Sequence, residues 1–266
     1  MDYKNLGIRT ISGAVLVALI VVAAIEPSHY WFYAVFWIIT IFSTAEFVKI
    51  NRGDKLHAGL YSVASLLLFT AASAYYLDLK VNLLYTALAY CAYILVLLLI
   101  ELWLKAENPI LNWELLALSQ LYIAVPMLCM CVLRNANLLL ALFVLIWVND
   151  TFAFLTGSYL GKHKMFERIS PKKSWEGFVG GNLFALGAAL VFAHYMTTYT
   201  FWQWLIIGDI VVVFGTLGDL VESLMKRTLG IKDSGNTIPG HGGFLDRFDS
   251  AIIASVALTI FSFFLL

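Results

Sequence analysis

The chain has 266 residues, no formal net charge at pH 7 and a mean hydropathy of +0.85; 61% of its residues are hydrophobic and 13% are charged. Soluble domains of this length are about half apolar and about a quarter charged. The composition therefore excludes an ordinary soluble domain and indicates a protein that crosses a membrane several times.

Runs of about 20 mainly apolar residues, the length that crosses a bilayer as a helix, recur about nine times along the chain. The expected spans are 8–25, 30–48, 58–77, 82–104, 114–133, 138–160, 177–196, 201–222 and 249–266. We therefore predict an all-α polytopic integral membrane protein with about nine transmembrane helices.

We expect two regions in this chain. The first five spans, over 1–137, carry no recognisable motif and are interpreted as a transmembrane scaffold. The last four, over 138–266, are interpreted as the catalytic region, with its longer loops at 161–176 and 223–248.

Basic residues are distributed unevenly about these spans. With nine spans, fifteen of the seventeen Lys and Arg residues lie on the side of the N-terminus, and only Lys80 and Arg134 lie on the other. Basic residues mark the cytoplasmic side of a membrane protein. We therefore expect the N-terminus and both longer loops to be cytoplasmic.

The sixth span contains a polar interruption at Asn149, Asp150 and Thr151. An ionisable residue inside a span is a functional candidate. Asp150 is interpreted as a site-lining residue that orients a lysine or reaches a nucleotide; a buried ion pair without direct chemistry is the alternative.

The loop at 161–176 is rich in basic residues and contains the ordered run Ser-Pro-Lys-Lys-Ser-Trp-Glu-Gly over 170–177. Cytoplasmic lysines often only contact anionic lipid headgroups. The order of this run favours a more specific role, and we expect Lys172 and Lys173 to contact phosphate groups.

The end of the eighth span places Asp219, Glu222, Ser223 and Lys226 on one helix face, because they are spaced at i, i+3, i+4 and i+7. This face offers carboxylates to a hard cation, and a hydroxyl and an ammonium group to phosphate oxygens. An ion pair between Asp219 and a neighbouring helix is the alternative.

A glycine-rich turn, Pro-Gly-His-Gly-Gly over 239–243, precedes the ninth span. Glycine permits positive φ and a close approach of backbone N–H groups to an anion. Asp246 and Asp249 follow it near the start of a helix, where they act as cation ligands or as helix caps. Mg²⁺ needs only one or two protein carboxylates when phosphates supply further ligands.

These residues together resemble the signature of the phosphatidate cytidylyltransferase family. The matching positions are Ser223, Lys226-Arg227, Lys232-Asp233, Pro239-Gly240-His241-Gly242-Gly243, Asp246-Arg247 and Asp249. The run at 170–177 and the Asp-Thr pair at 150–151 resemble further blocks of the same family.

The resemblance implies that CMP passes from CTP to phosphatidate in an inner-membrane enzyme whose active site is cytoplasmic. It implies Mg²⁺ and a second, monovalent cation such as K⁺ as cofactors, a homodimer, and no nucleic-acid partner. The expected catalytic residues are Asp219, Asp246, Lys226 and Lys173, and the expected metal ligands are Asp219, Asp246 and Asp249. The expected substrate-binding residues are Lys172, Ser223, Arg227, Lys232, Gly240, His241, Gly242, Gly243, Arg247 and Asp150.

Two other functions compete with this interpretation. A CTP-dependent lipid kinase of the polyprenol or phytol type would use a similar cation and nucleotide clamp but would transfer the γ-phosphate. An ion-coupled transporter would place Asp150 and Asp219 on its path, and broken helices or paired short spans would favour it.

Overall fold

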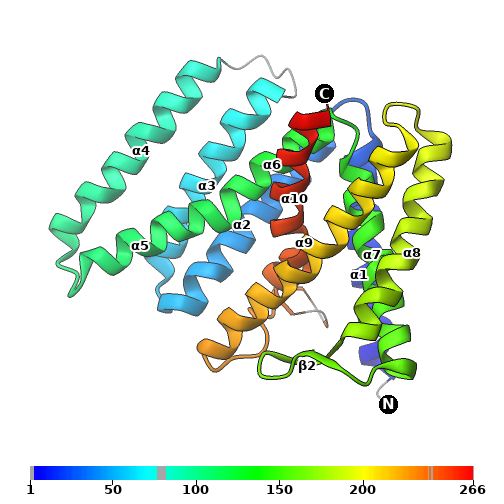
Figure 1. Cartoon of the computed structure of the whole chain (residues 1–266). Helices are drawn as coiled ribbons and strands as arrows, with labels where there is room; N and C mark the ends of the chain where they lie inside the picture. Colours follow the sequence, from blue (N-terminus) through cyan, green and yellow to red (C-terminus); the bar gives the residue numbers. More distant parts are fainter. Residues whose placement is uncertain (1–2, 77–81, 239, 241, 266) are drawn as a thin grey trace. The chain divides into compact units, whose positions relative to one another are not determined.

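The computed structural model describes residues 3–76, 82–238, 240 and 242–265. Within them the regular secondary structure is helical apart from one short hairpin (Figure 1) and an isolated bridge between Ile238 and Gly242. The elements are α1 (Tyr3–Ile25), α2 (Tyr30–Arg52), α3 (Lys55–Tyr76), α4 (Leu83–Leu104), α5 (Pro109–Ser119), the π-helical turn η1 (Gln120–Ala124), α6 (Val125–Asn135), α7 (Leu139–Leu160), β1 (Lys164–Phe166), β2 (Ser170–Ser174), α8 (Trp175–Tyr195), α9 (Phe201–Thr228) and α10 (Leu245–Leu265).

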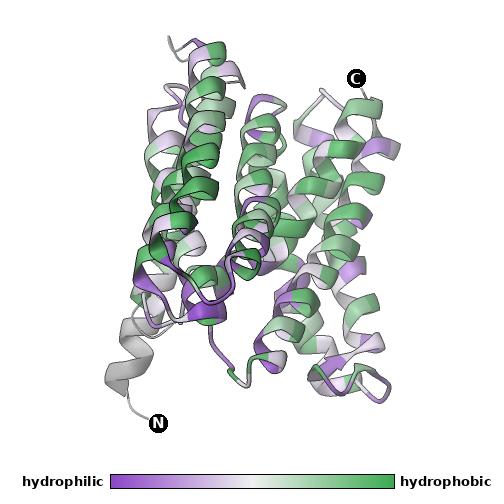
Figure 2. Ribbon diagram, turned by 90° about the vertical axis from the view of Figure 1, so that its left-hand side faces the viewer, coloured by the Kyte–Doolittle hydropathy of each residue, from purple (hydrophilic) through white to green (hydrophobic). Residues whose placement is uncertain are grey.

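The helices have the length and composition of membrane spans. Among the described residues, eight segments are long and apolar enough to cross a bilayer, and α5, η1 and α6 together form one of them, Pro109–Asn135. The apolar part of α1, Thr10–Ile25, is shorter than the other eight. Hydrophobic residues extend along the coloured helices (Figure 2). The prediction of an all-α polytopic membrane protein is confirmed.

The chain divides into two compact units, each described here by itself. The first unit comprises Met1–Asn135 and Asp233–Arg247, and therefore contains α1 to α6 and the segment that leads into α10. Helix α3 packs against α2, α4 and α6. Stacked aromatic rings fill part of this core, with the ring centroids of Phe32 and Phe36 4.4 Å apart.

The second unit comprises Ala136–Lys232 and Phe248–Leu266. Helix α8 packs along α7 and α9 (Figure 1). Helix α9 begins with a capping box, in which the Thr200 hydroxyl accepts from the Gln203 N–H while the Gln203 side chain accepts from the Thr200 N–H.

Two helix boundaries and one hairpin differ from the sequence-based expectation near the candidate site. Helix α9 continues to Thr228 and α10 begins at Leu245, so Ser223, Lys226 and Asp246 lie on helices, as their spacing predicted. The expected loop 223–248 is therefore shorter. The loop 161–176 contains an antiparallel hairpin of β1 and β2 that was not predicted.

The close packing of α7 and α8 leads to a first prediction. A Cβ atom at Gly181 would lie 2.5 Å from Oδ1 and 2.8 Å from the backbone oxygen of Asn149, whereas one at Gly187 would meet nothing within 4 Å. Gly181→Ala should lower the free energy of unfolding by about 1–3 kcal/mol, the usual cost of overpacking.

Gly187→Ala is the matched control on the same helix. Because alanine favours a helix over glycine by about 1 kcal/mol, this variant should be neutral or more stable. Thermal unfolding in detergent measures both variants, and equal melting temperatures would contradict the packing described here.

Candidate active site

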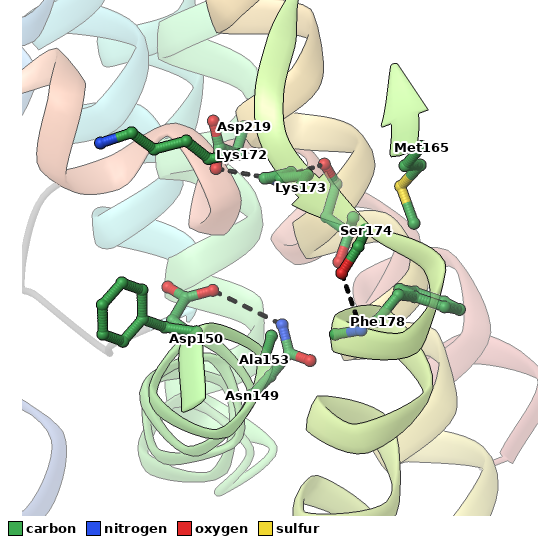
Figure 3. A pocket seen from close by; sticks show the side chains of 12 residues that line it. Asn149, Asp150, Ala153, Met165, Lys172, Lys173, Ser174, Phe178 and Asp219 are labelled. Atoms are coloured by element: carbon green, nitrogen blue, oxygen red, sulfur yellow. Dashed lines mark hydrogen bonds and ion pairs between the residues drawn. The ribbon is translucent and has the colours of Figure 1, made fainter. Parts of the chain in front are cut away.

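A pocket of about 220 Å³ lies within the second unit (Figure 3). It is bordered by α7, β2, α8 and α9. Its polar lining residues are Asn149, Asp150, Lys172, Lys173, Ser174, Thr216 and Asp219. The structure therefore brings together residues of the sixth predicted span, the basic loop and the end of the eighth predicted span.

Lys173 and Asp219 form an ion pair on one side of this pocket. The Lys173 Nζ atom lies 2.7 Å from Asp219 Oδ2, and the two side chains keep 26% and 32% of their surface exposed. Lys173 also donates to the backbone oxygen of Thr216 at 3.4 Å, and Ser223 Oγ donates to Asp219 Oδ1 at 3.1 Å. Lys172 is exposed, and its side chain points away from this pair (Figure 3).

The hairpin explains why the basic run is held at the pocket. Strand β2 runs directly into α8, and Ser174 caps that helix by accepting a hydrogen bond from the Gly177 N–H at 3.2 Å. Arg227 Nε on α9 donates to the backbone oxygen of Ile169 at 3.4 Å, just before β2. The two lysines therefore lie on a strand fixed at both ends.

Carboxyl groups from three helices gather in this unit. Asp150 on α7 interacts electrostatically with both Lys173 and Asp219. Asp249 on α10 interacts electrostatically with Asp219 and Asp150, and its side chain lies near that of Glu222.

Lys226 lies beside the same cluster. Its Nζ atom is 3.1 Å from Glu222 Oε1; Glu222 is fully buried and the Lys226 side chain is 11% exposed. The expected stripe of Asp219, Glu222, Ser223 and Lys226 is thus present, but as two internally paired couples, Asp219 with Ser223 and Glu222 with Lys226.

The glycine-rich turn belongs to the first unit. Gly240 and Gly242 have φ of 75° and 84°, which L-residues rarely adopt, and the Ile238 N–H donates to the Gly242 oxygen at 2.9 Å. Asp246 Oδ2 accepts from the N–H groups of Ser234 at 2.9 Å and Gly243 at 3.0 Å. Pro239 and His241 lie outside the described residues, so the predicted role of His241 stays a prediction.

The predicted site residues therefore fall into two groups. Asp219 belongs to the second unit and Asp246 to the first, so the predicted metal site shared by these two carboxylates stays a prediction. Lys232 and Arg247 are exposed. Arg227 donates to the backbone oxygens of Ile169 and Ile231, which gives it a structural role in the hairpin and the end of α9.

Sequence reasoning missed one residue of this region. Glu46, on α2, is 5% exposed and accepts hydrogen bonds from the segment around the glycine-rich turn. Its signal was present, because an ionisable residue inside an apolar span is a functional candidate by default. Spans that matched no motif were interpreted as scaffold, and Glu46 was passed over with them.

The donor set fits magnesium better than a metal held by the protein alone. Across the described part of the chain, no group of three or more His, Cys, Asp or Glu side chains is arranged to hold a metal ion. Mg²⁺ is usually held by one or two carboxylates, water and substrate phosphates. The partly exposed carboxylate of Asp219, among Asp150 and Asp249, suits that kind of binding.

The fold and these residues define a polytopic membrane protein with lysines and carboxylates clustered at a pocket among its helices. The family model described as the cytidylyltransferase family matches residues 7–265, and the chain belongs to this family.

Three relatives carry the name phosphatidate cytidylyltransferase. The proteins of Staphylococcus saprophyticus, Staphylococcus haemolyticus and Staphylococcus aureus are 45%, 44% and 42% identical over 128, 119 and 129 residues. These matches cover 48%, 44% and 48% of this chain and 49%, 46% and 49% of the relatives. The chain thus aligns with about half the length of each relative.

Proposed function

We propose that this protein transfers the cytidylyl group of CTP to phosphatidate, producing CDP-diacylglycerol and pyrophosphate. The observation that carries the proposal is the pocket that sets Lys173 against Asp219, with Lys172 and Asp150 at its border, within a membrane protein of the cytidylyltransferase family. The names of the relatives support phosphatidate as the acceptor.

The chemistry asks for little beyond binding and charge stabilisation. An oxygen of the phosphatidate phosphomonoester attacks the α-phosphorus of CTP, a new P–O bond forms, and the bond to the bridging oxygen of the β-phosphate breaks. Pyrophosphate leaves with the electron pair. Because the phosphomonoester is already an anion near neutral pH, the reaction needs no strong general base.

The lysines supply the positive charge in this scheme. The Lys173 ammonium, oriented by Asp219 and by the Thr216 oxygen, binds phosphate oxygens where charge develops during transfer. Lys172 is exposed beside it and binds the phosphate of the second substrate. Lys226 lies beside the buried Glu222 and adds positive charge at the end of α9.

We propose that Asp219 and Asp246 hold Mg²⁺ together with the phosphates of CTP, and that Asp249 contributes to the same site. When bound, the ion neutralises phosphate charge and stabilises the leaving pyrophosphate. The monovalent cation, such as K⁺, rests on the family resemblance alone.

The site is proposed to face the cytoplasm from the inner membrane, on the side that carries most of the Lys and Arg residues.

We also propose a homodimer. Asp209 on α9 is exposed and accepts from Asn182 Nδ2 at 2.9 Å. A carboxylate on a membrane span is costly unless water or protein covers it, and a second copy would provide such cover.

The reaction is tested by the position of the transferred phosphorus. Purified protein incubated with phosphatidate and CTP should move label from the α-phosphate, and none from the γ-phosphate, into the lipid. The pyrophosphate released should be unlabelled when CTP carries the label at the α-phosphate, and labelled when CTP carries it at the γ-phosphate. Transfer of the γ-label, with release of CDP, would instead establish a lipid kinase.

Substitution of Lys173 separates a phosphate contact from general positive charge. Arginine keeps the charge but has a planar, larger head, and it replaces a lysine poorly where a compact ammonium fits between fixed groups. Lys173→Arg should lower kcat/KM by about tenfold or more, equal to a barrier change of about 1.4 kcal/mol.

Lys162→Arg is the control, because Lys162 is an exposed residue of the same loop. Initial rates against CTP concentration in mixed micelles should show little change for this variant. Equal tolerance of arginine at both positions would remove Lys173 from the proposed mechanism.

Orientation is tested across α7, whose ends must lie on opposite sides of the membrane. In a variant lacking Cys91, Cys129 and Cys131, a cysteine at the exposed position Arg168 should be protected from an impermeant maleimide in intact cells. A cysteine at the exposed Asn135 should react. Arg134 is unsuitable, because it is buried and donates to the backbone oxygens of Ala23 and Glu26. The reverse labelling would place the site outside.

A further inference from the structure

Glu46 lies on α2 and is buried, yet its carboxylate is bound by a segment almost two hundred residues later in the chain. Glu46 Oε2 accepts from the Ser234 hydroxyl at 3.3 Å and from the Leu245 N–H at 3.0 Å. Its Oε1 accepts from the Thr237 hydroxyl at 2.5 Å. The three donors come from the beginning, middle and end of the segment 234–245, which we call the site loop.

Two glycines of the site loop make this approach possible. A Cβ atom at Gly243 would lie 2.3 Å from Glu46 Oε2, and one at Gly235 would lie 3.0 Å from Glu46 Oε1. Any side chain at Gly243 would therefore displace the carboxylate. Gly243 belongs to the expected phosphate-binding motif. In the structure it is also a position at which the loop backbone lies close to the Glu46 carboxylate.

A second contact from the same helix face reinforces this attachment. The rings of Phe42 and Phe244 are stacked, with centroids 5.1 Å apart and an interplanar angle of 14°. Phe42 and Glu46 are spaced at i and i+4, so they lie above one another on α2. One face of α2 therefore holds the site loop through an aromatic and a charged contact.

The site loop in turn holds Asp246, since Asp246 Oδ2 accepts from the N–H groups of Ser234 and Gly243. Ser234 uses its hydroxyl for Glu46 and its N–H for Asp246, so one residue links the two carboxylates. Both described donors to Asp246 therefore belong to the site loop, so the position of the loop affects how the Asp246 carboxylate is held.

We propose that Glu46 is a positioning residue for this enzyme: it does not touch substrate, but fixes the site loop so that Asp246 is held ready for a magnesium–nucleotide complex. The inference rests on the proposed function for the role of Asp246. A buried carboxylate without hydrogen-bond donors is unfavourable in free energy. Movement of the loop away from Glu46 would leave its carboxylate without these donors and is therefore opposed.

Glu46→Gln tests the inference, because it keeps the shape of the side chain and removes its charge. Glu101→Gln is the matched control: Glu101 is also a buried carboxylate of the first unit, 4% exposed against 5% for Glu46. Glu101 instead binds His57 Nε2 at 2.9 Å and Asn112 Nδ2 at 2.7 Å. Both variants should lose stability, but only the first should disturb the site loop.

The first measurement is independent of activity and of metal. Hydrogen–deuterium exchange of the backbone over 234–245 should be about tenfold faster in Glu46→Gln than in Glu101→Gln, the change expected from losing one charge-assisted hydrogen bond. Equal exchange in the two variants would overturn the proposal.

The second measurement is the magnesium concentration at half-maximal cytidylyl transfer. It should rise about tenfold for Glu46→Gln and stay near the wild-type value for Glu101→Gln. A fall in kcat that is equal in both variants, with unchanged magnesium dependence, would show a merely structural role and overturn the proposal.

Thr237→Val guards against a Glu46 variant that fails to fold. It removes one donor to Glu46 from outside the helix, and should change exchange and magnesium dependence in the same direction by a smaller factor. No change in either quantity would contradict the proposal.

These results separate the two claims. Normal wild-type transfer of the α-label, with identical behaviour of Glu46→Gln and Glu101→Gln, would reject the role of Glu46 and leave the proposed function intact. Failure of the wild-type protein to transfer the label would reject the function, while the exchange experiment would still decide whether Glu46 holds the loop.

Discussion

The cost of keeping charge where water is absent is the constraint on which this structure depends. A charged side chain within a membrane span costs about 2.5–3.5 kcal/mol on insertion scales unless it is paired or reaches water. Several charged side chains of the described spans have partners that offset this cost. Lys226 lies beside Glu222, Glu101 binds His57, and Arg134 donates to two backbone oxygens. The same pairing assembles the candidate site, where a lysine and a carboxylate from different elements meet at a pocket.

Pairing also explains why the site residues are held ready for ligands before any ligand binds. Lys173 is kept in place by Asp219 and a backbone oxygen, and phosphate oxygens could replace part of that environment without a large movement. Groups that are already oriented toward developing charge stabilise a transition state without a free-energy cost of reorganisation during the reaction. The hairpin supports this arrangement, because β2 is tied to α8 through Ser174 and to α9 through Arg227.

Most of the fold could be predicted from the sequence, because long apolar runs leave the backbone no alternative to helices in a bilayer. Features set by tertiary contacts could not. The hairpin at 164–174 lacks strand-like alternation and contains Pro171, and it is stabilised by contacts with α8 and α9. Of the candidate site, the positive φ of Gly240 agrees with expectation. The ion pair of Asp219 with Lys173 is of the kind that was set as the alternative to a metal ligand, and the metal role of Asp219 stays a prediction. Glu46 was missed because its partners follow almost two hundred residues later.

A motif that is continuous in sequence is therefore not one structural unit. Ser223 to Lys232 belongs to the second unit, the site loop and Asp246 belong to the first, and Asp249 returns to the second. Residues of the motif take part in two separate sets of contacts. At the end of α9, Lys226 pairs with Glu222, and in the first unit the site loop binds Glu46 on α2. This accounts for its glycines in two ways. Gly240 and Gly242 supply backbone angles that other residues resist, whereas Gly243 is small because a buried carboxylate occupies the space that a side chain would need.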